Sequence, residues 1–334
     1  MSAEAVVTAQ RLTKIYAAHG KQQESVVAAH DISFTLHAGE ILALIGESGS
    51  GKTTIGRLLT GIEKPTTGSL QWSSTLASGR GLGQVQMVFQ DPYAALNPFN
   101  PIRYTLTRPL INLRHVSPSE ALEQARAILK TVQLTPPDQF LVKRPHQLSG
   151  GQRQRIVIAR ALAASPQVIV ADEPVSMLDV SIRAEVLQLL RKLMVTRQIA
   201  AMLYITHDLM SARALAQRVI VLYRGRMVEA ASTDDLLSNP RHPYTQLLLA
   251  SIPNPRRAFR GESMAIPVSS GLTPSAANGC PFAPRCPQVE EECRQTAPNP
   301  EPLPDGRLVS CHVVARAANQ ERGAARPQTT APGN

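Results

Sequence analysis

Short, continuously apolar segments recur along the chain, and helical patterns lie between them. The clearest such segment, Ile41-Leu42-Ala43-Leu44-Ile45, contains no polar residue, which is typical of a strand buried on both faces of a sheet. Further strands are expected at residues 86–89, 168–171, 202–205 and 219–222, and helices at 181–197 and 208–217. Strands and helices that alternate in this way predict an α/β fold, in which helices cover both faces of a mainly parallel sheet.

Two parts of the chain depart from this alternation. Residues 6–45 predict several short strands, most clearly at 26–29 and 32–36. Residues from about 91 to 165 predict helices instead, and Ser117-Pro118-Ser119-Glu120 within them has the spacing of a capping box. We expect this helical stretch to form a lobe of its own.

The C-terminal part of the chain is richer in proline. A helix is expected at 244–251, with Leu247, Leu248 and Leu249 buried, but regular periodicity fades from Asn239 onward. These changes predict one large domain at residues 1–255 and a small extension at 256–317. Residues 318–334 have the composition of a disordered tail.

A glycine-rich stretch, GESGSGKTT, follows the strand at 41–45 and precedes a helical pattern. It fits the P-loop pattern of glycine, four residues, glycine, lysine, and serine or threonine. Glycines let backbone amides turn inward around phosphates, and the following helix directs its positive end at them. We expect Lys52 to contact the β- and γ-phosphates and Thr53 to bind Mg²⁺; the alternative is a chance glycine turn. The predicted phosphate-binding residues are Gly46, Glu47, Ser48, Gly49, Ser50, Gly51, Lys52, Thr53 and Thr54.

A pair of carboxylates, Asp172 and Glu173, follows the predicted strand at 168–171. A P-loop needs a carboxylate on a neighbouring strand for its metal ion, and Asp172 suits Mg²⁺, through a water molecule. Glu173 projects differently and is placed to polarise an attacking water as a general base. Without the P-loop, a solvated acidic strand end would be the better interpretation.

A second candidate anion site lies in the sequence LSGGQRQR, residues 148–155. Ser149-Gly150-Gly151, followed by Gln152, opens a predicted helix, where backbone donors, a hydroxyl group and the helix dipole favour an anion. The alternative is an ordinary N-cap followed by a glycine hinge. Two anion sites in one chain suggest that two such chains enclose ATP face to face.

In order and spacing, these motifs resemble those of the ATP-binding cassette (ABC) family. The chain also has an aromatic residue at Tyr16, a glutamine at Gln90, the segment Ser176-Met177-Leu178-Asp179 and a histidine at His207. The resemblance covers about residues 6–255 and continues more narrowly to about 313. It implies the fold of an ABC ATPase, which is a P-loop NTPase with an antiparallel β subdomain and a helical subdomain.

The resemblance also implies roles for single residues. Tyr16 would stack on adenine, and Gln90 would sense Mg²⁺ and the γ-phosphate. Asp179 would communicate across a dimer, and His207 would contact the γ-phosphate and the catalytic water. Met177 departs from the alanine usual in the family, so altered packing with retained activity is expected there. Each of these residues, taken singly, has a simpler alternative interpretation. Tyr16 could be an aromatic residue of a strand, Gln90 a polar surface residue and His207 a helix cap.

Two further segments, Asp91–Pro98 and Asn239–Thr245, resemble the dipeptide and oligopeptide importer branch of that family. This implies an ATP-hydrolysing subunit, peripheral to the cytoplasmic side of a bacterial inner membrane, that powers import of peptides or related small solutes. Its partners would be a paralogous ABC ATPase in a heterodimer, two transmembrane permease subunits and an extracytoplasmic substrate-binding protein. A coupling helix of a permease would dock beside Asp91–Pro98.

All four cysteines lie late in the chain, at Cys280, Cys286, Cys293 and Cys311. In a reducing compartment such a cluster favours metal binding over disulfides. The spacings differ from those of common zinc fingers, and four thiolates can hold zinc or an iron–sulfur cluster. The segment resembles the C-terminal extension of the importer branch, which implies a structural [4Fe-4S] cluster. Zinc is the second alternative, and packed thiols without a metal are the third.

The formal net charge of +10 is spread along the chain. It permits contact with an anionic membrane surface or with phosphates, but it forms no dedicated nucleic-acid arm. No segment approaches the roughly 20 apolar residues that cross a bilayer, and no signal-peptide pattern is present, so a cytosolic location is expected.

The alternative function is a soluble ABC ATPase that acts on nucleic acid or ribosomes. Such proteins generally carry two cassettes in one chain or dedicated nucleic-acid insertions. This sequence predicts a single cassette and contains no basic strip interleaved with aromatic residues. We therefore expect no nucleic-acid partner.

Overall fold

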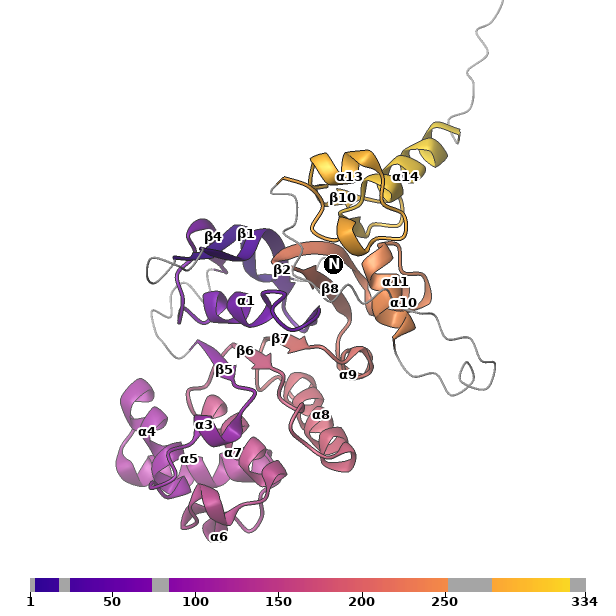
Figure 1. Ribbon diagram of the computed structural model, residues 1–334. Coiled ribbons are helices and arrows are strands. Elements are labelled where there is room, and N and C mark those ends of the chain that lie inside the picture. The colour runs from indigo at the N-terminus through magenta and orange to yellow at the C-terminus, as the bar shows by residue number, and fades with distance from the viewer. Residues whose placement is uncertain (1–3, 18–24, 74–83, 252–277, 325–334) are drawn as a thin grey trace, which may run out of the picture.

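The computed structural model describes residues 4–17, 25–73, 84–251 and 278–324. Within these residues it contains a larger and a smaller β-sheet, a helical lobe and a C-terminal knob formed by residues 278–324 (Figure 1). The larger sheet has, in spatial order, β10 (Glu301–Pro302), β11 (Leu308–Val309), β9 (Arg226–Ser232), β8 (Arg218–Tyr223), β3 (Ile41–Ile45), β7 (Ala201–Thr206), β6 (Val168–Asp172) and β5 (Val85–Val88).

The central strands of the larger sheet are parallel, whereas β9, β11 and β10 add to one edge in antiparallel fashion. Every residue of β3, β6 and β7 is buried, which confirms the expectation from their apolar sequences. Because these three strands are parallel, their carboxyl ends meet at one edge of the sheet. The segments that follow them, residues 46–54, Glu173 and His207, are thereby brought together.

The smaller sheet is antiparallel and covers one face of the larger one. Its order is β2 (Val26–His37), β1 (Ala5–Tyr16) and β4 (Thr67–Trp72), so the two strands expected at 26–29 and 32–36 form a single strand. Between the sheets lies helix α1 (Lys52–Leu59), and one hydrophobic core joins Leu42 and Leu44 of β3 to Ile55 of α1. Ile41, Ala43 and Ile45 belong to a second core on the opposite face, as strand alternation requires.

The helical lobe lies at the end of β5 and continues that second core (Figure 1). Ser117 caps helix α5, because its hydroxyl oxygen accepts a hydrogen bond from the Glu120 amide at 3.3 Å. Ala121, Ala125 and Leu129 form the buried face of this helix. The helices of the lobe are α3 (Pro92–Ala95), α4 (Ile102–Arg114), α5 (Pro118–Thr131), α6 (Pro137–Leu141) and α7 (Gly150–Ala163).

Within residues 164–251, which the structure describes, four further helices follow the lobe. They are α8 (Val180–Val195), α9 (Leu209–Leu215), α10 (Thr233–Ser238) and α11 (Pro243–Ala250). The expectation that Leu247 to Leu249 are buried is wrong, since all three are only partly buried. Tyr244 and Thr245 at the start of α11 are buried instead.

The C-terminal knob lies beside α10 and α11 (Figure 1). It contains a 3-10 turn (Ala283–Arg285), α13 (Glu291–Gln295), the strands β10 and β11, and α14 (His312–Ala324). Strand β11 pairs with β9, so the knob extends the central sheet. Helix α14 continues beyond residue 318, where a disordered tail was expected to begin; residues 325–334 of that expected tail lie outside the described residues.

Among the helices described, none combines the length and the apolar character that crossing a membrane requires.

Candidate active site

A pocket of about 730 Å³ opens at the carboxyl edge of β3, β6 and β7. It brings together most of the residues predicted for nucleotide binding and catalysis. Three residues of β2, Val26 to Ala28, also line it, and sequence reasoning missed them because they read as ordinary strand positions. The lining consists of Tyr16, Val26, Val27, Ala28, Glu47, Ser48, Gly49, Gly51, Lys52, Thr53, Thr54, Gln90, Glu173 and His207.

The glycine-rich loop wraps around the start of α1. Gly51 is the N-cap of this helix and has φ 97°, a left-handed conformation that favours glycine. A Cβ at this position would collide with the carbonyl oxygen of Ala28. The backbone amides at this end of α1 are therefore positioned by a turn that only glycine accommodates, and this is the local geometry that an anion site at a helix N-terminus requires.

The Lys52 ammonium group folds back over the loop. Its Nζ donates hydrogen bonds to the carbonyl oxygens of Gly46 at 2.7 Å and Glu47 at 2.8 Å. Burial lowers the pKa of Lys52, and the carboxylates of Glu173, Asp172 and Glu47 oppose this effect. The ammonium group thus lies in the hollow of the loop, where it can exchange carbonyl oxygens for phosphate oxygens.

Thr53 and Asp172 are the two candidate magnesium ligands, and they contact each other beside the loop. The Thr53 hydroxyl donates to Oδ1 of Asp172 at 3.2 Å. Burial raises the pKa of Asp172, while the hydrogen bond from Thr53 lowers it. A hydroxyl and a carboxylate oxygen suit Mg²⁺, which usually takes one or two protein ligands and completes its shell with water and phosphate. The donor set therefore fits the predicted magnesium site.

Glu173 is held between Gln90 and His207. Its Oε2 accepts a hydrogen bond from Nε2 of Gln90 at 3.0 Å and lies 3.2 Å from Nδ1 of His207. Its backbone has φ 45°, a left-handed conformation that costs free energy for a residue with a side chain. Asp172 contacts Thr53, whereas Glu173 contacts Gln90 and His207, so the two neighbouring carboxylates have different partners.

Tyr16 also lines the pocket. Nζ of Lys14 lies 5.0 Å from the centroid of its ring. Val26 and Val27 also line the pocket, and these two residues are 60% and 44% exposed. An aromatic ring beside exposed aliphatic groups offers a flat planar base a surface on which to stack.

The second predicted anion site lies elsewhere. Ser149 caps α7 in a reciprocal box, because its hydroxyl accepts from the Gln152 amide at 3.3 Å and Oε1 of Gln152 accepts from the Ser149 amide at 3.1 Å. Ser149, Gly150 and Gly151 are in the helical lobe and do not line the pocket.

Two residues of the segment Ser176–Asp179 lie at the surface. Met177 is 59% exposed, so an altered packing at this residue would have to involve something other than the rest of this chain. Asp179, at the N-cap of α8, is exposed as well.

The four cysteines gather in the C-terminal knob without forming a metal-binding group. The thiols are free, and the Cys280 amide donates to the Cys293 carbonyl oxygen at 2.8 Å. Burial raises the pKa of Cys280 and Cys311, and it raises that of Cys286 to about 11. No set of three His, Cys, Asp or Glu side chains in the described ranges is arranged to hold a metal ion. The expected [4Fe-4S] cluster and the zinc alternative are therefore not shown by this arrangement of the thiols.

The chain has a glycine-rich loop with a lysine at a helix N-terminus and a threonine–aspartate pair beside it. These features place it among the P-loop nucleoside triphosphatases. Comparison with known families narrows this class. Residues 29–176 match the ABC transporter family, and residues 228–293 match the C-terminal region of oligopeptide and dipeptide transporters.

Individual relatives cover nearly the whole chain. A probable peptide ABC transporter ATP-binding protein of Sinorhizobium fredii, y4tS, is 41% identical over 94% of this chain and 92% of its own length. The dipeptide transport ATP-binding protein DppF of Haemophilus influenzae is 42% identical over 87% of this chain and 90% of its own. The solved structure of the cassette MJ0796 bound to ADP and Pi has a TM-score of 0.58 and 29% identity, and covers 68% of this chain and 98% of the other. The chain therefore belongs to the family of ABC transporter ATP-binding proteins and is an ATPase of this type.

Proposed function

We propose that this ABC ATPase powers the import of di- or oligopeptides, or of related small solutes, as one half of a two-cassette sandwich. This sandwich, in which two chains enclose the nucleotide, is inferred from the separation of the two predicted anion sites. The pocket contains the phosphate loop and the carboxylates, whereas the Ser149 helix tip lies in another lobe of the same chain. A nucleotide held by both sites must lie between two chains. The solved MJ0796 cassette is described as dimeric, which supports this arrangement.

In the proposed reaction, the loop amides and Lys52 hold the triphosphate while Glu173 accepts a proton from a water molecule. The oxygen of that water attacks the γ-phosphorus, and the bond from this phosphorus to the bridging oxygen breaks to give ADP and phosphate. Gln90 and His207 are placed to orient Glu173 and the water, because both contact the same carboxylate oxygen. Thr53 and Asp172 would hold Mg²⁺, which would neutralise charge on the phosphates.

Replacing Ser149 by glutamate tests the sandwich. The carboxylate would face the phosphates bound by the companion chain, so ATP-dependent association and hydrolysis are expected to fall by at least about 100-fold. Nucleotide affinity of the single chain is expected to stay within about twofold of the wild type, because Ser149 lies outside its own pocket. Analytical ultracentrifugation and phosphate release measure the first effect, and titration with a fluorescent ATP analogue measures the second.

Ser117 provides the matched control, since it is also a helix N-cap of the lobe. The Ser117→Glu variant is expected to retain association and hydrolysis. Equal behaviour of the two variants would contradict the sandwich.

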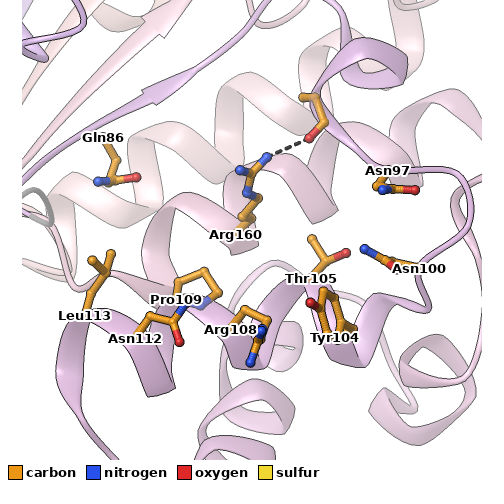
Figure 2. Close-up of a pocket in the computed structure, with 11 residues that line it drawn as sticks. Gln86, Asn97, Asn100, Tyr104, Thr105, Arg108, Pro109, Asn112, Leu113 and Arg160 are labelled. Carbon is orange, nitrogen blue, oxygen red and sulfur yellow. Dashed lines mark hydrogen bonds between the residues drawn. The ribbon is translucent and has the colours of Figure 1, made fainter.

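A surface for the permease partners is proposed on the helical lobe. A pocket of about 450 Å³ lies between α3, α4 and α7, where Nη1 of Arg160 donates to the Ala95 carbonyl oxygen at 2.6 Å (Figure 2). Nearby Tyr93 and Phe99 are 62% and 81% exposed. Exposed aromatic residues beside a polar pocket suit an inserted helix of a partner protein. This location agrees with the docking site expected beside Asp91–Pro98.

The proposals for the remaining partners and for the transported solute are based on the relatives. Those are named as peptide, dipeptide and di/tripeptide transport ATP-binding proteins, which favours peptide import over the nucleic-acid alternative. A paralogous ATPase in a heterodimer, two permease subunits, a substrate-binding protein and a peripheral position at the inner membrane are parts of this proposal.

The [4Fe-4S] cluster stays a prediction. It is supported by the closeness of the thiols, since Cys280, Cys293 and Cys311 act electrostatically on the pKa of Cys286. Ligation would require the thiols to lose their protons and move together. An iron–sulfur cluster is expected to give broad visible absorption in anaerobically purified protein, whereas stoichiometric zinc without colour supports the second alternative. Colourless, metal-free protein would contradict both metal sites.

A further inference from the structure

One residue of the phosphate loop, Glu47, is bound by the C-terminal knob. Its carboxylate accepts two hydrogen bonds from Arg285, from Nη1 at 3.0 Å and from Nη2 at 3.1 Å. Its backbone amide donates to the hydroxyl oxygen of Tyr244 at 3.1 Å. Its carbonyl oxygen accepts from Nζ of Lys52 at 2.8 Å. Every polar group of Glu47 is therefore fixed, and two of the partners come from beyond the P-loop and its strands.

Arg285 is largely enclosed by its neighbours. It ends the 3-10 turn at Ala283–Arg285, and its side chain is only 23% exposed. Its guanidinium carbon lies 5.8 Å from the ring centroid of Tyr223 and 5.9 Å from that of Phe282. Tyr223 and Phe282 also pack against Tyr244, with ring centroids 4.6 and 5.4 Å from it. Arg285 and Tyr244, which both bind Glu47, therefore contact the same two aromatic rings.

The charge on Glu47 needs this partner because the residue lines the pocket that takes a triphosphate. A carboxylate at the wall of such a pocket repels the phosphates unless a cation neutralises it. A bidentate guanidinium–carboxylate pair neutralises the charge and also fixes the direction of the side chain. The pair is therefore suited to keep the loop open toward phosphate.

We propose that Arg285 is a positioning residue for nucleotide binding: by pairing with Glu47, the C-terminal knob neutralises and orders the phosphate loop. The inference rests on the nucleotide site of the single chain and is independent of the two-chain sandwich. It gives the C-terminal knob a part in the ATPase reaction, since a residue of the knob neutralises a charge at the wall of the pocket.

The test compares nucleotide affinities of full-length variants, measured with fluorescent ATP and ADP analogues in the presence of Mg²⁺. The Arg285→Ala variant is expected to bind the ATP analogue roughly five- to tenfold more weakly, because an unpaired carboxylate then faces the phosphates. The loss is expected to be smaller for the ADP analogue, which carries less charge, and to shrink as salt is raised. Arg285→Lys, which keeps the charge but loses the fork, is expected to lie between Arg285→Ala and the wild type.

A second substitution separates electrostatics from folding. In the Arg285→Ala/Glu47→Gln double variant, no carboxylate remains to repel phosphate, so affinity is expected to return to within about twofold of the wild type. Arg294→Ala removes an exposed arginine from the same knob and is the matched control. Arg285→Ala binding as tightly as Arg294→Ala, or a loss that Glu47→Gln does not relieve, would overturn the proposal.

Discussion

Replacing Glu173 by glutamine is expected to lower ATP hydrolysis by at least about 100-fold while leaving ATP binding intact. Glutamine keeps the size of the side chain and can still pair with Gln90 and His207, which both contact the same Glu173 oxygen. It cannot accept a proton from the attacking water at neutral pH. ATP would then hold the two cassettes together without being consumed, and a stable closed dimer should accumulate.

Phosphate release and size-exclusion chromatography with ATP measure the two parts of this result. Glu123→Gln changes an exposed carboxylate of α5, whose side chain is 73% exposed, and should behave like the wild type. Turnover at a normal rate by the Glu173→Gln protein would exclude Glu173 as the general base. Loss of ATP binding would show that its main role is to order the phosphate loop.

The second large effect concerns stability, and it is expected when Arg307 is replaced by methionine. Glu229 on β9 is fully buried, and Nη1 of Arg307 lies 3.5 Å from its carboxylate. The same nitrogen donates to the Asn239 carbonyl oxygen at 2.7 Å, and Arg307 itself is only 5% exposed. Removing one partner of a buried ion pair leaves an uncompensated charge, so the free energy of unfolding should fall by about 3 to 5 kcal/mol.

Urea denaturation of the full chain measures this loss. Two backbone amides, those of Arg241 and His242, still donate to Glu229, and Glu229→Gln in the Arg307→Met background should recover part of the stability. Arg316 forms its ion pairs at the surface, and Arg316→Met should leave the denaturation midpoint near that of the wild type. Similar denaturation midpoints for the Arg307→Met and Arg316→Met proteins would show that the buried charge of Glu229 does not need Arg307 to be compensated.

Local patterns predict the core of the fold and of the pocket well. The parallel strands are continuous apolar runs because both of their faces are covered, and the glycine loop follows one of them directly. Gln90, Glu173 and His207 follow other strands of the same sheet, so parallel topology alone brings them together. Helix ends differ from prediction by a few residues; α8, for example, ends at Val195 where 197 was expected.

Contacts between distant segments could not be predicted in this way. Arg285 and Glu47 are 238 residues apart, and no periodicity or spacing connects them. Strands β10 and β11 have two residues each, too short for an alternating pattern. Burial of Tyr244 in place of the leucines of α11 depends on Phe282 and Tyr223, which approach from the knob and from β8. Tertiary packing decides these features.

The pairing of β11 with β9 has a practical consequence for anyone who shortens the chain. A protein ending near residue 255 would leave the backbone groups of β9 unpaired on this side and would also lose Arg307 from beside Glu229. Unprotected strand edges join to one another between molecules. Such a fragment should precipitate or self-associate during expression, so soluble material is best sought by keeping residues through Ala324 in one piece.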